Sequence, residues 1–221
     1  IDTNEYVINK NEKLILTDPG GIEIFPSVLS SLSTEANPTN IEYIFASHQD
    51  PDIISSLTLW LEINPTIKCF TSYLWSTFLP HFGGNDSTFI TIPDNGSEIS
   101  FHGLDLEFVA AHYLHSSGNF HLYDKKAKIY FSGDIGAALL PPALLALPEI
   151  YVTDFDSHIK YCKGFHERWM GSNEAKLDWC SRVSKLQIEQ LCPQHGLIFK
   201  NKDIERFINW FAELKVGVLK S

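Results

Sequence analysis

The sequence has 221 residues, of which 44% are hydrophobic and 20% are charged. This length fits one ordinary domain or two very small ones, and this composition excludes a disordered chain and a fibrous repeat. The formal net charge of −10, from 17 Lys and Arg against 27 Asp and Glu, repels phosphate backbones and anionic lipid surfaces. We therefore expect a single globular domain over residues 1–221, with neither nucleic acid nor a membrane as partner.

The sequence shows no membrane span and no signal peptide, and its cysteine pattern is not that of a disulfide framework. We therefore expect a cytoplasmic protein. The most apolar stretch, residues 135–147, is interrupted by Pro141 and Pro142 and falls short of the roughly 20 residues that a membrane span needs. Charged residues begin at Asp2, where a signal peptide would be apolar. The four cysteines form no CxxC pair, so we expect buried thiols and not disulfides or a cysteine metal site; they are Cys69, Cys162, Cys180 and Cys192.

Hydrophobic patterning predicts the elements of the first half of the chain. Short apolar runs between polar breaks indicate strands, and apolar residues at helical spacing indicate helices. In chain order we predict strands at 6–8, 14–16 and 22–25, a helix near Ser27, a strand at 41–46, a helix from Asp52 through Leu61, a strand at 67–70, a helical stretch around Leu74 and a strand at 89–92.

The second half continues the same alternation. We predict strands at 99–102, 104–111, 120–123, 127–132, 151–155 and 188–192, a helix from a Ser172 cap through Val183, and a last helix over 207–214. The pattern is that of a mixed α/β chain. Its unusual polar residues fall at strand ends, where α/β folds build their sites.

Three imidazoles and three carboxylates stand at these strand ends: His48, Asp50, Asp52, His115, Asp134 and His195. Alternate positions 48, 50 and 52 can point the same way, as metal chelation from a strand end requires. The alternative interpretation of this triplet is a solvated loop in which Asp52 caps the following helix.

The segments that carry the other ligands resemble the successive metal motifs of the metallo-β-lactamase superfamily. With the His48 loop, the matching segments are 114–120, 131–135 and 193–196, and the resemblance begins at the strand and turn of residues 16–20. It covers nearly the whole chain. It implies an α/β (α+β) fold, the four-layer αββα sandwich, with two metals at one edge of its sheets.

One departure from the hydrolases of that superfamily indicates a particular branch. Asp50 stands where they have the second His of HxHxDH, and carboxylates suit iron or manganese better than zinc hydrolase chemistry. A carboxylate at this position marks the flavodiiron proteins and the related oxygen-binding diiron proteins. Residues 165–170 with Ser172 and Asn173 also resemble the segment that precedes the final His motif in that branch.

The resemblance implies a role for each ligand. His48, Asp50 and His115 would hold one iron, Asp52 and His195 the other, and Asp134 would bridge the two. Such a bridge keeps two cations within a few Å, so that O2 can span them. No flavin is expected in this chain, because no GxGxxG stands in the sequence and the chain ends soon after Phe211 without the flavodoxin domain of flavodiiron proteins.

A second departure concerns the second iron. The family commonly has a His after the last Asp of the first motif, and here that position is Ile53. The resemblance then implies an open coordination position, for water, for O2 or for another histidine. The candidate histidines are His112, His121 and His166.

Three functions remain open from the sequence. The first is a diiron protein that binds O2 and acts as an oxygen or iron sensor through a signalling partner, such as a chemotaxis receptor. The second is an O2 or NO reductase core that takes electrons from an external donor. The third is a metal-dependent hydrolase, which Asp50 and Ile53 disfavour.

Overall fold

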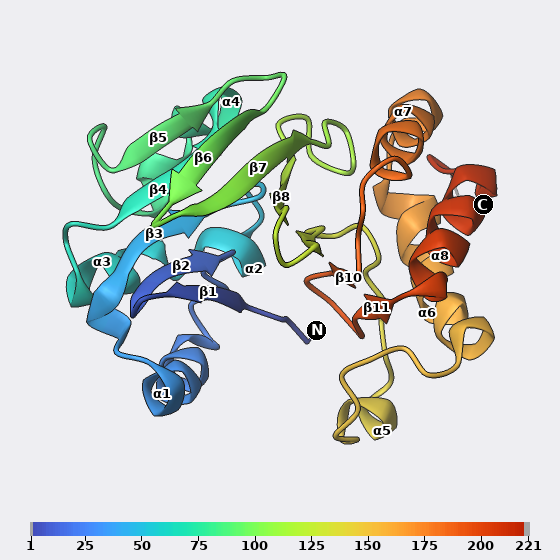
Figure 1. Ribbon diagram of the computed structural model, residues 1–221, viewed down its shortest axis with the longest axis horizontal. Coiled ribbons are helices and arrows are strands. Elements are labelled where there is room, and N and C mark those ends of the chain that lie inside the picture. Colours follow the sequence, from blue (N-terminus) through green and yellow to red (C-terminus); the bar gives the residue numbers. More distant parts are fainter. Residues whose placement is uncertain (1, 219–221) are drawn as a thin grey trace. The chain divides into compact units, whose positions relative to one another are not determined.

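The computed structural model describes residues 2–218, whose strands form two sheets, of five and six strands (Figure 1). The chain divides into two compact units. We call residues 5–110 the N-terminal unit, and residues 2–4 together with 111–218 the C-terminal unit. The prediction of one domain over residues 1–221 is not tested by this division and stays a prediction.

The N-terminal unit contains most of the strands. Its elements in chain order are β1 (Tyr6–Lys10), β2 (Lys13–Thr17), α1 (Phe25–Glu35), η1 (Pro38–Asn40), β3 (Ile41–Phe45), α2 (Pro51–Ile54), α3 (Leu57–Ile63), β4 (Lys68–Ser72), α4 (Tyr73–Ser76), η2 (Leu79–Phe82), β5 (Phe89–Ile92), β6 (Ser97–Phe101) and β7 (Leu104–Ala110).

The five-stranded sheet has the order β1-β2-β3-β4-β5, in which β1 and β2 are antiparallel and the later neighbours are parallel. Because side chains alternate across a strand, Ile44 joins the buried cluster under the helices. Phe45 instead contacts Phe108 of β7, at 5.3 Å between ring centroids. The antiparallel β6–β7 pair therefore covers the other face of this sheet.

The C-terminal unit joins short strands to three long helices. Its elements are β8 (Phe120–Asp124), β9 (Ile129–Phe131), α5 (Pro142–Leu145), α6 (Phe155–Trp169), α7 (Asn173–Val183), β10 (Gln190–Cys192), β11 (Phe199–Lys200) and α8 (Lys202–Glu213).

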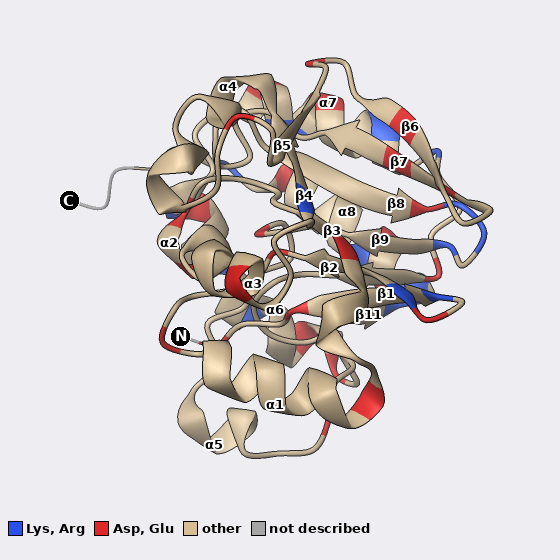
Figure 2. Ribbon diagram, turned by 90° about the vertical axis from the view of Figure 1, so that its left-hand side faces the viewer, with Lys and Arg blue, Asp and Glu red and all other residues tan. Residues whose placement is uncertain are grey.

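Aromatic side chains fill the core of the C-terminal unit. Strand β8 pairs with β9, β9 runs parallel to β10, and β10 pairs with β11. Helix α8 turns Phe207 and Phe211 inward, where Phe211 lies 5.9 Å from the ring of Trp179. In Figure 2, β8 shows no charge before its last residue, and the Lys residues gather in the turn that follows. Its five residues are all buried.

Most predicted elements are confirmed, and two predicted strands are wrong. Residues 22–25 form a turn and the start of α1, because Pro26 suits a first helical turn. Residues 151–155 form one isolated bridge, and Phe155 begins the 15-residue helix α6, which the sequence pattern did not predict. The helix predicted from Asp52 is two short helices, separated where the Ser56 hydroxyl donates to the Pro19 carbonyl at 2.6 Å.

The four cysteines are free and buried, as predicted. Burial raises the pKa of the Cys192 thiol to about 12, so this thiol stays protonated at neutral pH. Within residues 2–218, no helix is long and apolar enough to cross a membrane.

Candidate metal centre

In the N-terminal unit, a turn fixes the loop that follows β3. Asp18, which has a φ of 49°, follows β2. Its N–H donates to the Phe45 carbonyl at 2.7 Å, and its Oδ1 accepts from the Ser47 N–H at 2.7 Å. The next residue, Pro19, accepts from the indole of Trp60 at 3.0 Å. The conformation of the loop after β3 is therefore tied to the strand beside it and to a buried tryptophan.

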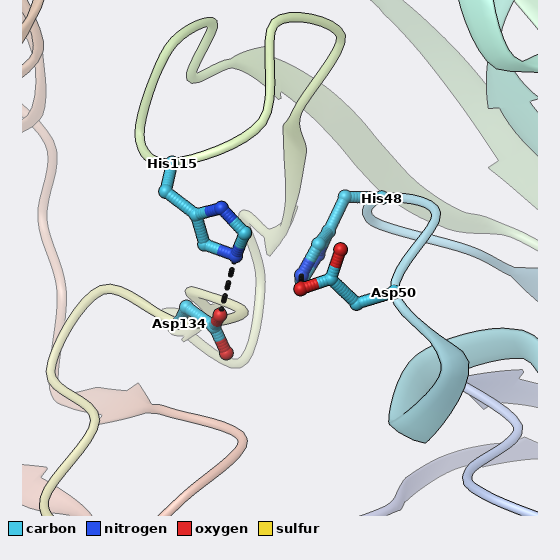
Figure 3. Close-up of side chains that lie close together, drawn as sticks. All are labelled: His48, Asp50, His115 and Asp134. Atoms are coloured by element: carbon cyan, nitrogen blue, oxygen red, sulfur yellow. Dashed lines mark ion pairs between the residues drawn. The ribbon is translucent and has the colours of Figure 1, made fainter. Parts of the chain in front are cut away.

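His48 and Asp50 point toward one another from this loop (Figure 3). His48 is 1% exposed, its Nδ1 lies 2.9 Å from the Ser47 hydroxyl, and its Nε2 lies 3.7 Å from Asp50 Oδ2. Asp50 also occupies the N-cap position of α2, but its carboxylate makes no capping hydrogen bond. Gln49 donates to Asp50 Oδ1 at 2.9 Å. The Asp50 carboxylate is thus oriented toward His48 and does not cap the helix with a hydrogen bond.

Asp52 and Ile53 lie in the short helix α2. Asp52 is in the first turn and the N-cap is Asp50, so the alternative interpretation of Asp52 as the cap of this helix is wrong. Ile53 is fully buried in the apolar cluster that contains Leu16 and Ile44. The position where the resemblance leads one to look for a histidine is therefore part of the hydrophobic core.

In the C-terminal unit, His115 stands on a tightly bonded loop. The Ala111 N–H donates to the Asn119 carbonyl at 3.0 Å and closes the loop at its base. The Asn119 amide donates to the Leu114 carbonyl, directly before His115. His115 Nε2 lies 3.1 Å from Asp134 Oδ2.

Asp134 is placed between two histidines. It follows β9 in a turn that the Ser132 hydroxyl closes on the Ile135 carbonyl at 2.6 Å. Its Oδ2 faces His115, and its Oδ1 lies 3.4 Å from His195 Nε2. With 4% of its surface exposed, this carboxylate presents one oxygen to each of two imidazoles, which is the arrangement that a bridging ligand requires.

His195 follows β10 and is 2% exposed. Its Nδ1 lies 2.5 Å from the carbonyl of Asp2. A carbonyl can only accept, so Nδ1 carries the proton and the lone pair is on Nε2, the atom that faces Asp134. Gly196 has a φ of 83°, and a Cβ there would lie 2.7 Å from the Cβ of Ala138, so only glycine fits after this histidine.

Two of the three candidate histidines for an open coordination position are engaged elsewhere. His166 Nε2 accepts from the Gly136 N–H at 3.0 Å and its Nδ1 lies 2.8 Å from the Cys162 carbonyl, so both nitrogens are used. Burial lowers the pKa of His166 to about 4, which keeps the ring neutral. At His121, the Trp179 indole N–H, which can only donate, lies 3.2 Å from Nδ1. His166 and His121 are therefore structural, and His112 stays a prediction.

Four of the six expected ligands form one compact group. In the described part of the chain, His48, Asp50, His115 and Asp134 each offer one ligand atom, and these atoms lie within 4.8 Å of one another (Figure 3). His195 contacts Asp134 but is outside this group, and so is Asp52. A mixed set of imidazoles and carboxylates suits divalent iron or manganese, so the residues present fit the metals that the resemblance implies.

Comparison with known proteins gives the family. The family model described as ODP family beta lactamase matches residues 1–196. The chain belongs to this family. A structure entitled "Peroxy diiron species of chemotaxis sensor ODP" is 37% identical, with a TM-score of 0.89, and the match covers 98% of this chain and 88% of that one. The apo state of chemotaxis sensor ODP from T. denticola is 38% identical over 96% of this chain and 86% of that one, with a TM-score of 0.89.

Flavodiiron proteins are similar over part of their length. A mutant of the flavo di-iron protein from Thermotoga maritima is 25% identical, with a TM-score of 0.84, over 95% of this chain and 51% of that one. The chain spans about half the length, or less, of the curated relatives that it matches. The predicted fold class, a mixed α/β chain with two sheets of the metallo-β-lactamase type, is confirmed, as is the resemblance to the flavodiiron branch.

The hydrogen bonds that hold the ligand loops in place were not predicted from the sequence. Asn119 and His166 act on the site through backbone carbonyls and amides. A signal for α6 was present, because Asp154 caps the helix through the Ser157 N–H and Phe155, His158 and Cys162 follow at helical spacing. No local pattern indicates the contacts of Asp2 with residues 195 and 196.

Proposed function

We propose that this protein binds two iron ions and O2, and that it serves as an oxygen or iron sensor that reports through a signalling partner of the chemotaxis type. His48, Asp50 and His115 would hold one ion, Asp52 and His195 would hold the other, and Asp134 would be shared by both. The observation that carries the proposal is the placement of Asp134, with one oxygen toward His115 and the other toward His195. The similarity to the chemotaxis sensor ODP supports the sensing role.

When bound, a pair of ferrous ions supplies one electron from each ion to O2. The chain's own residues do the rest. The Asp2 carbonyl keeps the proton of His195 on Nδ1, and the buried positions of His48 and Asp134 limit the access of water to the ligand atoms. Orientation of this kind is what outer residues contribute to a metal site. Cytoplasmic residence and the identity of the partner stay predictions.

The test is anaerobic loading with Fe(II), followed by an iron count, admission of air and visible absorption with time. We expect two irons per chain and a long-lived absorption band after air. The variant Asp134→Ala should lose both features, whereas His81→Ala, which changes an exposed histidine, should keep them. Binding of fewer than two irons by the parent protein, or no reaction with O2, would contradict the proposal.

An O2 or NO reductase core is the second candidate, favoured by the similarity to flavo di-iron proteins. Its activity would depend on an electron donor outside residues 1–221. The loaded protein is therefore mixed with a reduced flavoprotein or rubredoxin, and O2 and NO consumption are followed at steady state. Continued uptake with a fleeting absorption band would indicate a reductase, and a stable band without turnover would indicate a sensor.

A further inference from the structure

The first residues of the chain bind the loop that carries His195. The Asn4 side-chain amide donates to the carbonyl of Pro193 at 3.1 Å and to that of Gly196 at 2.8 Å. The Asn4 backbone N–H donates to the Gln194 carbonyl at 2.6 Å. Asn4 therefore bonds to residues on both sides of His195.

Asp2 completes this arrangement. Its carbonyl accepts from His195 Nδ1 at 2.5 Å, and its carboxylate Oδ2 accepts from the Gly196 N–H at 3.0 Å. With the bonds of Asn4, every residue from 193 to 196 is bonded to Asp2 or Asn4. We call residues 2–4 the N-terminal strap.

We propose that Asp2 and Asn4 are positioning residues that set the affinity of one of the two metals through His195. The inference rests on the proposed function, because it takes His195 as a ligand. The strap fixes the ring in two ways: the Asp2 carbonyl holds the proton on Nδ1, and the bonds of Asn4 hold the backbone from which the ring projects. The lone pair of Nε2 is then held toward Asp134, 3.4 Å away.

The strap should affect the binding of one metal and not of the other. His195 is assigned to one metal only, whereas His115 stands on a loop closed by its own bonds between residues 111 and 119. Loss of the strap contacts should lower the affinity for one metal ion and leave the affinity for the other nearly unchanged. If the strap only stabilised the fold, its loss would lower the affinity for both metal ions together, because both sites depend on the folded C-terminal unit.

The test uses an isosteric variant and one matched control. Asn4→Asp keeps the shape of the side chain but replaces both N–H donors with an acceptor beside two carbonyls. Asn209→Asp introduces the same charge as Asn4→Asp at an exposed position of α8. Each full-length protein is titrated with Co(II) under anaerobic conditions, and the visible ligand-field bands report both binding steps.

We expect Asn4→Asp to weaken one Co(II) step by about 10-fold or more, the usual effect of removing an outer partner of a ligating histidine. The other step should stay within about two-fold, and the control Asn209→Asp should match the parent. In a His195→Ala background, Asn4→Asp should have no further effect, because both changes act on the same ligand. If Asn4→Asp does not fold, Asn4→Ala removes the donors without adding a charge and is titrated in its place.

Equal weakening of both steps, or no change in either, would overturn the inference while the proposed function stands. Binding of fewer than two Co(II) by the parent protein would overturn the proposed function and the inference together. If His195→Ala leaves both steps intact, His195 is not a ligand, and the role of the strap fails with that assignment.

Discussion

The N-terminal and C-terminal units hold their candidate metal ligands in different ways. In the N-terminal unit, His48, Asp50 and Asp52 stand within five consecutive residues, in the loop after β3 and the first turn of α2. The turn at Asp18 fixes that loop from a neighbouring strand. In the C-terminal unit, the ligands come from three separate loops, and the bonds that fix His195 come from residues 2–4, more than 190 positions away along the chain. One half of the site is a local motif, and the other is assembled by tertiary structure.

The difference shows which contacts should matter most. A local loop keeps its ligands together even when one outside bond is lost, because the chain connects them. Ligands on separate loops depend on each bond that holds each loop. We therefore expect changes in the C-terminal unit to affect metal binding more strongly than matched changes in the N-terminal unit.

The largest effect is expected at Asp134. Asp134→Ala removes the carboxylate whose two oxygens face His115 and His195, so under the proposed function both metals would lose a shared ligand. The affinity for Fe(II) should fall by about 100-fold or more, since loss of an outer partner alone costs about 10–100-fold. Iron per chain is measured after desalting, where Asp50→Ala should lose one iron and Asp134→Ala both. Retention of two irons by Asp134→Ala would show that it does not bridge them.

A pair of buried tryptophans, one in each unit, compares the two cores. Trp60 and Trp179 are both fully buried, so either Trp→Ala change should lower the free energy of unfolding by about 3–5 kcal/mol. Trp60→Phe keeps most of the packing but loses the hydrogen bond to the Pro19 carbonyl. This change should lower the free energy of unfolding by about 1–2 kcal/mol. Urea unfolding measures each value, and a cost below about 1 kcal/mol for either alanine variant would contradict the burial seen here.

The pH dependence of stability should include a contribution from His158 of the C-terminal unit. This side chain is 5% exposed against the ring of Phe199, and burial lowers its pKa from 6.5 to about 4. Above pH 6.5 the ring is neutral in both states. Between pH 6.5 and 4 only the unfolded chain takes up the proton, so stability falls by about 3 kcal/mol and then levels off.

The measurement for His158 is urea unfolding from about pH 7 to about pH 4 in the parent protein and in His158→Leu. Other groups titrate in both proteins, so the difference between the two curves isolates His158. We expect the parent to lose about 3 kcal/mol more than the variant over this range. Parallel curves would show that His158 takes up its proton in the folded state as easily as in the unfolded state.

The smallest effect on metal binding is expected at Asp18, which fixes the local loop of the N-terminal unit. Asp18→Ala removes the acceptor of the Ser47 N–H and should cost about 1–3 kcal/mol of stability. Asp18→Asn keeps an acceptor oxygen and should cost less. Because the loop keeps its ligands together, the Co(II) affinities should change by less than about three-fold, and a loss as large as that of Asn4→Asp would contradict the comparison between the units.

The sequence was a good guide wherever a signal is local. Strand β5 and helix α7 match their predicted ranges, because an apolar run and a Ser172 cap mark them directly. The start of α6 was predicted wrongly as a strand, since the apolar residues from Tyr151 to Phe155 suit a strand until Asp154 is recognised as a cap. Both errors of element type lie where a short apolar run leads into a helix.

The order of four motifs predicts six ligand residues, and this assignment stays a prediction. The surroundings of these residues could not be predicted from the sequence. The helical spacing of Ile53 with Leu57 indicates a buried face, but it does not show that the Ile53 side chain packs in the cluster of Leu16 and Ile44. Nor does the sequence show that the ring nitrogens of His166 and His121 form hydrogen bonds with backbone and aromatic partners. Hydrogen-bond partners of a buried histidine depend on which elements meet, and this is decided after the elements form.

The sequence by itself determined the chemistry of the candidate site: six imidazole and carboxylate side chains at predicted strand ends, in the motif order of one superfamily. Only the tertiary structure decided which oxygen of Asp134 faces which histidine and that Asp2 and Asn4 hold the loop of His195. The physical reason is the distance along the chain between the residues that interact. Side-chain type and spacing are properties of neighbouring residues, whereas the proton position and direction of a ligating ring are set by partners that only folding brings near.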